Sequence, residues 1–145
     1  AEEGPMGKIN LSRVILGGAV AGIVVNILSY LLHDVVLKTQ HEEMMKALGK
    51  TLPAGGDGMV MWLVYGFVWA LVAVWLYAAI RPRLGAGPGT AVKTGVVVWF
   101  FGSFLTAFLM VNLGLMGWSP LQLVLELVVS VLAVLAGAAV YKEAV

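Results

Sequence analysis

Cysteine is absent from the sequence, and charged residues make up only 12% of its 145 positions. The lack of cysteine excludes disulfides, thiolate metal ligands and a cysteine nucleophile. With a net charge of only +1, the chain has no electrostatic basis for binding nucleic acid, and no nucleic-acid partner is expected. A phosphate-binding loop is also lacking, because the glycines of 85-GAGPG-89 flank Pro88 and are not followed by Lys-Ser/Thr.

Apolar residues are abundant instead. Hydrophobic residues account for 61% of the chain, and its mean hydropathy is +0.96, against about half apolar residues in an ordinary globular domain. A soluble protein of this size exposes too much of its surface to water to hide so much apolar area. The composition therefore predicts a single domain, spanning 1–145, whose solvent is lipid.

Four apolar segments are long enough to cross a hydrocarbon core of about 30 Å, which needs about 20 helical residues. They cover about 12–33, 59–80, 92–113 and 120–141. Each must be helical, because lipid cannot satisfy free backbone groups and four spans are too few for a barrel. The expected fold is all-α: an integral membrane four-helix bundle.

The connection between the first two spans, 33-HDVVLKTQHEEMMKALG-49, has its own helical pattern. Asp34, Lys38, Glu42 and Lys46 alternate in sign at i,i+4 spacing, which stabilises a helix. Gly49 is suited to end it. We therefore expect an additional amphipathic helix that extends the first span or lies at the membrane surface.

The arrangement of Lys and Arg predicts the orientation. Six basic residues flank one set of span ends and three flank the other, so the first set is predicted to be cytoplasmic. Both termini then lie in the cytoplasm of a multi-pass protein of the bacterial inner (plasma) membrane. Residues 1–5 resemble a cloning remnant before a native start at Met6. The six are Lys8, Arg13, Arg81, Arg83, Lys93 and Lys142.

One carboxylate interrupts the fourth span, at Glu126 in 121-LQLVLELVVS-130. It lies about six residues, or about 9 Å, below the predicted outer end of that helix. A charged group at the membrane centre costs about 2.5–3.5 kcal/mol on insertion scales. We therefore expect the carboxyl group to face protein or water rather than lipid.

The first span carries polar residues at matching depth. Asn26, Tyr30 and His33 share one helical face, which continues toward the cytoplasm as Gly18 and Gly22. The Glu126 face of the fourth span continues similarly as Ala133 and Gly137. We expect these faces to meet, tightly on the cytoplasmic side and around a polar pocket on the outer side. The candidate ligand-binding residues are Glu126, Asn26, Tyr30, His33, Gln122, Ser130 and Asn112.

Three functions fit this pattern. The first is binding of a lipid, a quinone or another small apolar molecule, or of a partner membrane protein, at the outer-leaflet pocket. The second is proton-coupled transport by a small transporter that uses Glu126. In the third, the chain is a structural or accessory subunit in which Glu126 only joins helices by hydrogen bonds. Faces of small residues on each span predict close packing of the four helices. A homo-oligomer and contacts with membrane lipid are also expected.

Catalytic and metal-binding patterns are weak. His33 and His41 could hold a metal with nearby acids, but on one continuous helix Asp34 and His41 lie about 10 Å apart, so no metal site is expected. A hydrolytic triad would need a serine, a histidine and an acid, and Ser29, His33 and Glu126 match these residue types. The sequence, however, has no nucleophile elbow, so a triad is not expected. An enzyme is not expected, and no cofactor can be named.

The segments 76-LYAAIRPRLGAGPGTAVKTG-95, 43-EMMKALGK-50 and 17-GGAVAGIVVN-26 together resemble small four-span bacterial membrane proteins of the domain-of-unknown-function type. The resemblance implies a plan of one span, an outer Met-rich helix and three further spans in a bacterial inner membrane. It implies no function.

Overall fold

The computed structural model describes residues 8–50 and 56–142, and helices are the only regular secondary structure in these two ranges. The helices are α1 (Leu11–Tyr30), α2 (Lys38–Ala47), α3 (Gly56–Leu84), α4 (Pro88–Trp99), α5 (Leu105–Asn112) and α6 (Pro120–Val140). Two π-helical segments, η1 (Leu31–Val36) and η2 (Phe100–Phe104), continue α1 and join α4 to α5.

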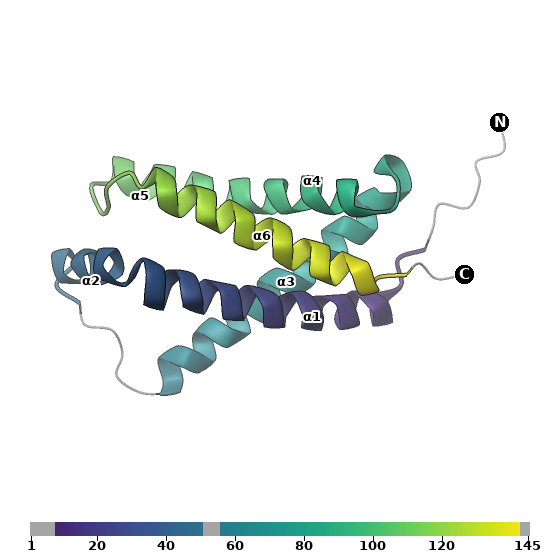
Figure 1. Ribbon diagram of the computed structural model, residues 1–145, viewed down its shortest axis with the longest axis horizontal. Coiled ribbons are helices and arrows are strands. Elements are labelled where there is room, and N and C mark those ends of the chain that lie inside the picture. Colours follow the sequence, from purple (N-terminus) through teal and green to yellow (C-terminus); the bar gives the residue numbers. More distant parts are fainter. Residues whose placement is uncertain (1–7, 51–55, 143–145) are drawn as a thin grey trace.

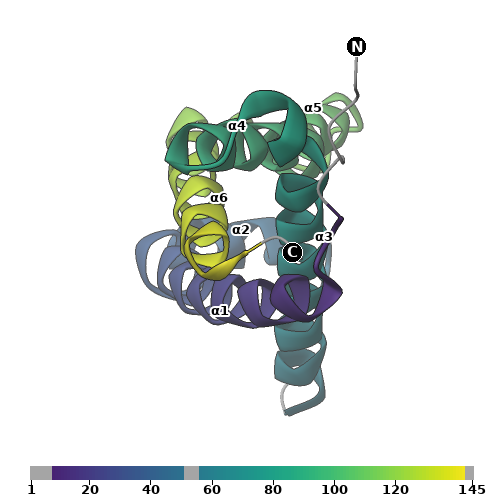
Figure 2. The same ribbon diagram turned by 90° about the vertical axis from the view of Figure 1, so that its right-hand side faces the viewer.

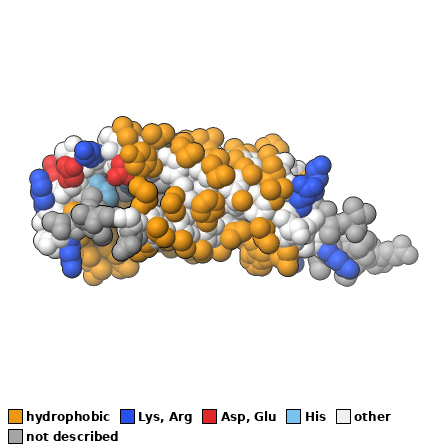
Figure 3. Space-filling model, turned by 90° about the horizontal axis from the view of Figure 1, so that it is seen from below, with side chains coloured by type: hydrophobic (Ala, Val, Ile, Leu, Met, Phe, Trp, Pro, Cys, Tyr) orange, Lys and Arg blue, Asp and Glu red, His pale blue; other side chains and the backbone are white. Residues whose placement is uncertain are grey.

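Four stretches are long and apolar enough to cross a membrane: Leu11–Val36, Gly58–Leu84, Pro88–Asn112 and Pro120–Val140. They pack side by side as a bundle, with the short α2 between the first two (Figures 1 and 2). Apolar side chains form a belt between two charged ends (Figure 3). The predicted fold class is therefore confirmed, and the chain is a multi-pass integral membrane protein.

The two ends of the bundle differ. One end, called here the α2 end, contains α2, the start of α3 and the connection 113–119. The other, called the basic end, contains the start of α1, the α3–α4 turn and the end of α6 (Figure 1). Asp and Glu side chains appear only toward the α2 end of the face in Figure 3.

Two helix ends differ from the sequence prediction. The second span continues through Pro82 to Leu84, and the third begins at Pro88 rather than near 92. The turn is tight because Gly85 (φ 90°) and Gly87 (φ 122°) adopt positive φ, which glycine tolerates best. The hydroxyl of Thr90 donates to the carbonyl oxygen of Gly85 at 2.7 Å and so caps the end of α3.

Small residues allow the close approach of helices, but the pairing differs from the prediction. A Cβ on Gly18 or Gly22 would collide with Leu71 or Phe67 of α3. The neighbouring Gly17 faces α6 instead, where a Cβ on it would lie 2.8 Å from the Gly137 carbonyl oxygen. The prediction that the Gly18/Gly22 face meets α6 is therefore wrong, because α1 has two adjacent small faces and this one packs on α3.

The tightest packing lies between the middle of the bundle and the basic end. Fully buried residues there include Ala21, Ala70, Val74, Ala133 and Val134. Toward the α2 end, by contrast, neither η2 nor α5 has a buried residue. All seven residues of α3 from Met59 to Tyr65 are exposed.

Candidate functional site

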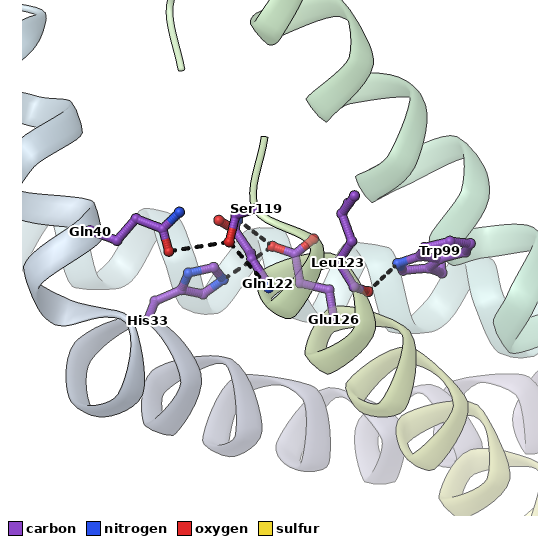
Figure 4. A network of polar contacts seen from close by, with 7 residues as sticks. All are labelled: His33, Gln40, Trp99, Ser119, Gln122, Leu123 and Glu126. Carbon is purple, nitrogen blue, oxygen red and sulfur yellow. Dashed lines mark hydrogen bonds and ion pairs between the residues drawn. The ribbon is translucent and has the colours of Figure 1, made fainter. Parts of the chain in front are cut away.

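Glu126 is at the centre of a polar network near the α2 end (Figure 4). The side-chain amide of Gln122 donates a hydrogen bond to its carboxylate oxygen Oε1 at 2.8 Å. Nε2 of His33 lies 3.8 Å from the same oxygen. The side chains of Glu126 and His33 are 18% and 31% exposed, so the pair is sheltered but reachable.

Local sequence positions the α6 half of this network. The hydroxyl of Ser119 accepts a hydrogen bond from the backbone N–H of Gln122 at 3.3 Å, and Pro120 occupies the first turn. Ser119 is therefore the N-cap of α6. Only the Ser119 half of a capping box forms, because the Gln122 side chain extends one turn along the helix to Glu126 instead of turning back to Ser119. The cap thus fixes both residues relative to the end of the helix.

A change in helix geometry positions His33. The segment from Leu31 to Val36 is π-helical, and such segments turn less per residue than an α-helix. The change begins between Tyr30 and His33, so these two residues no longer keep the shared face that a regular α-helix would give. Tyr30 is 58% exposed, whereas His33 contacts Glu126 of α6. The sequence alone gave no signal for this change.

The short helix α2 closes over the network. The Ser119 hydroxyl donates to the side-chain oxygen of Gln40 at 3.4 Å, linking α2 to the start of α6. The rings of His33 and His41 meet edge to face, with centroids 6.3 Å apart. Leu37 makes this contact feasible, because the helix breaks there (φ −103°, ψ 18°) and Leu37 itself is buried.

The break at Leu37 also corrects the premise that residues 33–49 form one continuous helix. Even so, no group of three or more His, Asp or Glu residues suited to a metal ion occurs in the described part of the chain. Of the predicted i,i+4 ladder, Lys38 and Glu42 form an ion pair at 4.0 Å.

Among the predicted site residues, Asn26 lies farthest from its expected position facing Glu126. Its side-chain amide donates to the carbonyl oxygen of Leu63 in α3 at 3.3 Å, and its oxygen occupies the space that a Cβ on Gly66 would fill. Asn26 therefore joins α1 to α3 rather than reaching Glu126. Its face of α1, like that of Gly22 one turn earlier, packs on α3.

Two further candidate residues lie apart from the carboxylate. Asn112 is exposed, and its amide donates to the carbonyl oxygen of Phe108 in its own helix at 2.7 Å. Ser130 is buried on α6, one turn closer to the basic end than Glu126. The structure thus brings together Glu126, Gln122 and His33 of the predicted set.

Trp99 is a neighbour of the network that is absent from the predicted set of site residues. Its indole N–H donates to the carbonyl oxygen of Leu123 at 2.9 Å and ties α4 to α6 beside the network (Figure 4). Phe104 packs between Trp99 and Trp118, with ring centroids 5.8 and 6.3 Å away. An aromatic wall therefore continues from the polar network toward the lipid-facing surface.

A shallow pocket of about 220 Å³ lies on the outer surface of α3 at the α2 end, lined by Met61, Trp62 and Tyr65. It is entirely lined by one helix and belongs to the exposed stretch of α3. Comparison of the chain with protein-family models, curated proteins and solved structures finds no match.

The network offers specific chemistry. A carboxylate within a membrane span is costly unless it is hydrogen-bonded or paired with a cation. Among the described residues, no Lys or Arg forms an ion pair with Glu126, which instead contacts Gln122 and His33. The carboxylate can therefore accept further hydrogen bonds from a polar group that enters the membrane with an apolar tail.

Proposed function

We propose that the protein binds an amphiphilic small molecule, such as a lipid or a quinone, at the α2 end of the bundle. The observation that carries this proposal is a partly exposed carboxylate inside a membrane span, without a Lys or Arg partner among the described residues. Glu126, Gln122 and His33 would hold the polar head. The exposed aromatic wall would hold the apolar part, and the chain would act as a binding protein rather than an enzyme.

The loose packing of the α2 half supports access from the membrane. No residue is buried in η2, in α5 or in α3 from Met59 to Tyr65. The half of the bundle toward the basic end is tightly packed. A molecule dissolved in the lipid could therefore approach sideways without unfolding a core. A partner membrane protein that inserts a helix would use the same access.

The same proposal includes an orientation. Basic residues favour the cytoplasmic side of membrane proteins, and six of the nine lie at the basic end. We therefore place the basic end in the cytoplasm of a bacterial inner membrane. The Glu126 network then lies in the outer leaflet.

The test is native mass spectrometry of mildly extracted protein, with identification of the retained molecules. Wild-type protein should carry an amphiphile that Glu126→Gln loses. Glu43→Gln is the matched control, because it makes the same chemical change on an exposed residue of α2. A wild-type protein without bound amphiphile, or a Glu126→Gln variant that retains it fully, would contradict the proposal.

Two alternatives predict different behaviour of the same Glu126→Gln variant in further measurements. Contact between two titratable groups, His33 and Glu126, favours proton-coupled transport as the second candidate. Transport in reconstituted vesicles would then depend on a pH gradient and be lost in Glu126→Gln. If Glu126 serves only as structural support, the variant lowers the melting temperature while retained molecules stay unchanged.

A further inference from the structure

Among the residues that the structure describes, the basic end carries Lys and Arg but no Asp or Glu. Six basic residues lie there, whereas all four described acidic side chains (Asp34, Glu42, Glu43 and Glu126) lie toward the α2 end. The sequence contains no Asp or Glu at all between Asp57 and Glu126, a range that includes the whole α3–α4 turn. In Figure 3 the basic end of the molecule shows Lys and Arg without Asp or Glu among the coloured side chains.

Helix geometry gathers these charges at the edge of the apolar belt. Arg13 lies in the first turn of α1, Arg81 and Arg83 in the last turn of α3, and Lys93 early in α4. α1 and α4 begin at this end and α3 and α6 end there, so the helix dipoles largely cancel and the positive charge comes from the side chains. The resulting field is located at the depth of lipid headgroups.

Two tyrosines, Tyr77 and Tyr141, connect the helices at the basic end. The Arg81 guanidinium carbon lies 5.4 Å from the ring centre of Tyr141, at the end of α6. The Tyr141 hydroxyl accepts a hydrogen bond from the backbone N–H of Asn10 at 3.2 Å, which ties the end of α6 to the start of α1. The Tyr77 hydroxyl accepts a hydrogen bond from the backbone N–H of Gly87 at 3.2 Å, which ties α3 to the α3–α4 turn.

The other end of the molecule has cations of a different kind. Lys38, Lys46 and Lys50 lie on or beside α2, which also carries Glu42 and Glu43. Lys38 and Glu42 form an ion pair at 4.0 Å. Three acidic residues, Asp34, Glu42 and Glu43, lie on or beside the same short helix, so its described side chains carry almost no net charge. A weaker attraction for anions is therefore expected there than at the basic end.

We propose that the basic end is a binding surface for the headgroups of anionic phospholipids. Charge complementarity argues for this occupant, because clustered Lys and Arg beside membrane spans attract anionic lipid phosphates. A soluble anion lacks the acyl chains that would pack on the apolar belt immediately beside Arg83 and Lys93. This surface is independent of the Glu126 network, which lies at the opposite end.

The experiment measures lipid preference. The protein is incubated with equal amounts of phosphatidylglycerol and phosphatidylcholine, and the bound lipids are counted by native mass spectrometry. Wild-type protein should retain mainly phosphatidylglycerol. The double variant Arg83→Gln/Lys93→Gln removes two exposed cations, and the ratio should fall by up to about fivefold for each charge removed.

The control is Lys46→Gln/Lys50→Gln, which removes two exposed cations from the α2 end. It changes the net charge equally and should leave the lipid ratio at the wild-type value. Equal losses in both double variants, or no preference in the wild type, would overturn the proposal. Because all four side chains are exposed, helicity should be unchanged. If the double variant nevertheless fails to fold, the Arg83→Gln and Lys93→Gln single variants replace it, each with up to about fivefold loss.

Discussion

The contact between α1 and α6 at Gly137 provides a quantitative test of the helix packing. A Cβ at this position would lie 2.5 Å from Cγ2 of Val74, 2.8 Å from the carbonyl oxygen of Gly17 and 3.0 Å from Cβ of Ala21. A flexible side chain could move away, but a backbone carbonyl of a neighbouring helix cannot. Gly137→Ala must therefore push α1 away from α6.

The expected cost follows from two opposing effects. Replacing glycine by alanine in a helix is favourable by up to about 1 kcal/mol. Overpacking a close-packed core costs about 1–3 kcal/mol, and occasionally more. Because two of the three contacts are below 3.0 Å, we expect overpacking to dominate and the free energy of unfolding to fall by about 1–3 kcal/mol.

Gly102→Ala is the matched control. Gly102 also lies within a membrane span, but the nearest atom to its Cβ would be Nε1 of Trp69, at an ordinary contact distance of 3.8 Å. This variant should keep wild-type stability or gain up to about 1 kcal/mol. The two variants thus make the same chemical change, one at a crowded helix contact and the other in open space.

Reversible unfolding in mixed detergent micelles, followed by circular dichroism, measures both variants against the wild type. The reasoning is refuted if Gly137→Ala is as stable as Gly102→Ala. It is also refuted if Gly102→Ala is the more damaging change, since η2 would then pack closely where the structure leaves it exposed.

Two further predictions follow from single contacts. Trp99→Phe removes the hydrogen bond to Leu123 and should lower the unfolding free energy by about 0.6–2 kcal/mol, whereas Trp75→Phe, on an exposed residue, should have little effect in the same unfolding assay. If the chain self-associates, the exposed Gly102 is an accessible approach point for a second helix, so Gly102→Cys should cross-link to its own copy under mild oxidation. Ile15→Cys, on an exposed part of α1, is the comparison, and equal cross-linking of both would indicate random collision.

The four spans could be predicted because lipid imposes a length and a composition that few other environments tolerate. The prediction failed mainly at helix ends. Pro82 looked like part of a turn, yet α3 continues to Leu84. Proline near the end of a helix removes only one hydrogen bond there, while the glycines at 85 and 87 supply the positive φ that reverses the chain.

The candidate site was only partly predictable. Residue counting matched the depth of Glu126 to Asn26 and placed His33 at the outer end of the first span, whereas in the structure His33 and Gln122 contact the carboxylate. The direction of Asn26 depends on how α1 is rotated about its own axis, which residue spacing alone does not define. The contact of Trp99 with α6 could not be predicted, because its partner is the backbone carbonyl of Leu123 and a backbone acceptor leaves no pattern in the sequence.

The two ends of the bundle have different roles: the basic end stabilises the fold, and the α2 end is accessible. Toward the basic end, small residues and two tyrosine hydroxyls bind α1, α3, α4 and α6 into a close-packed unit. Toward the α2 end, polar contacts at Glu126 and Gln40 replace close packing. Opening that end would break a few hydrogen bonds without exposing a core. A molecule could therefore exchange at Glu126 while the basic end keeps the four spans together.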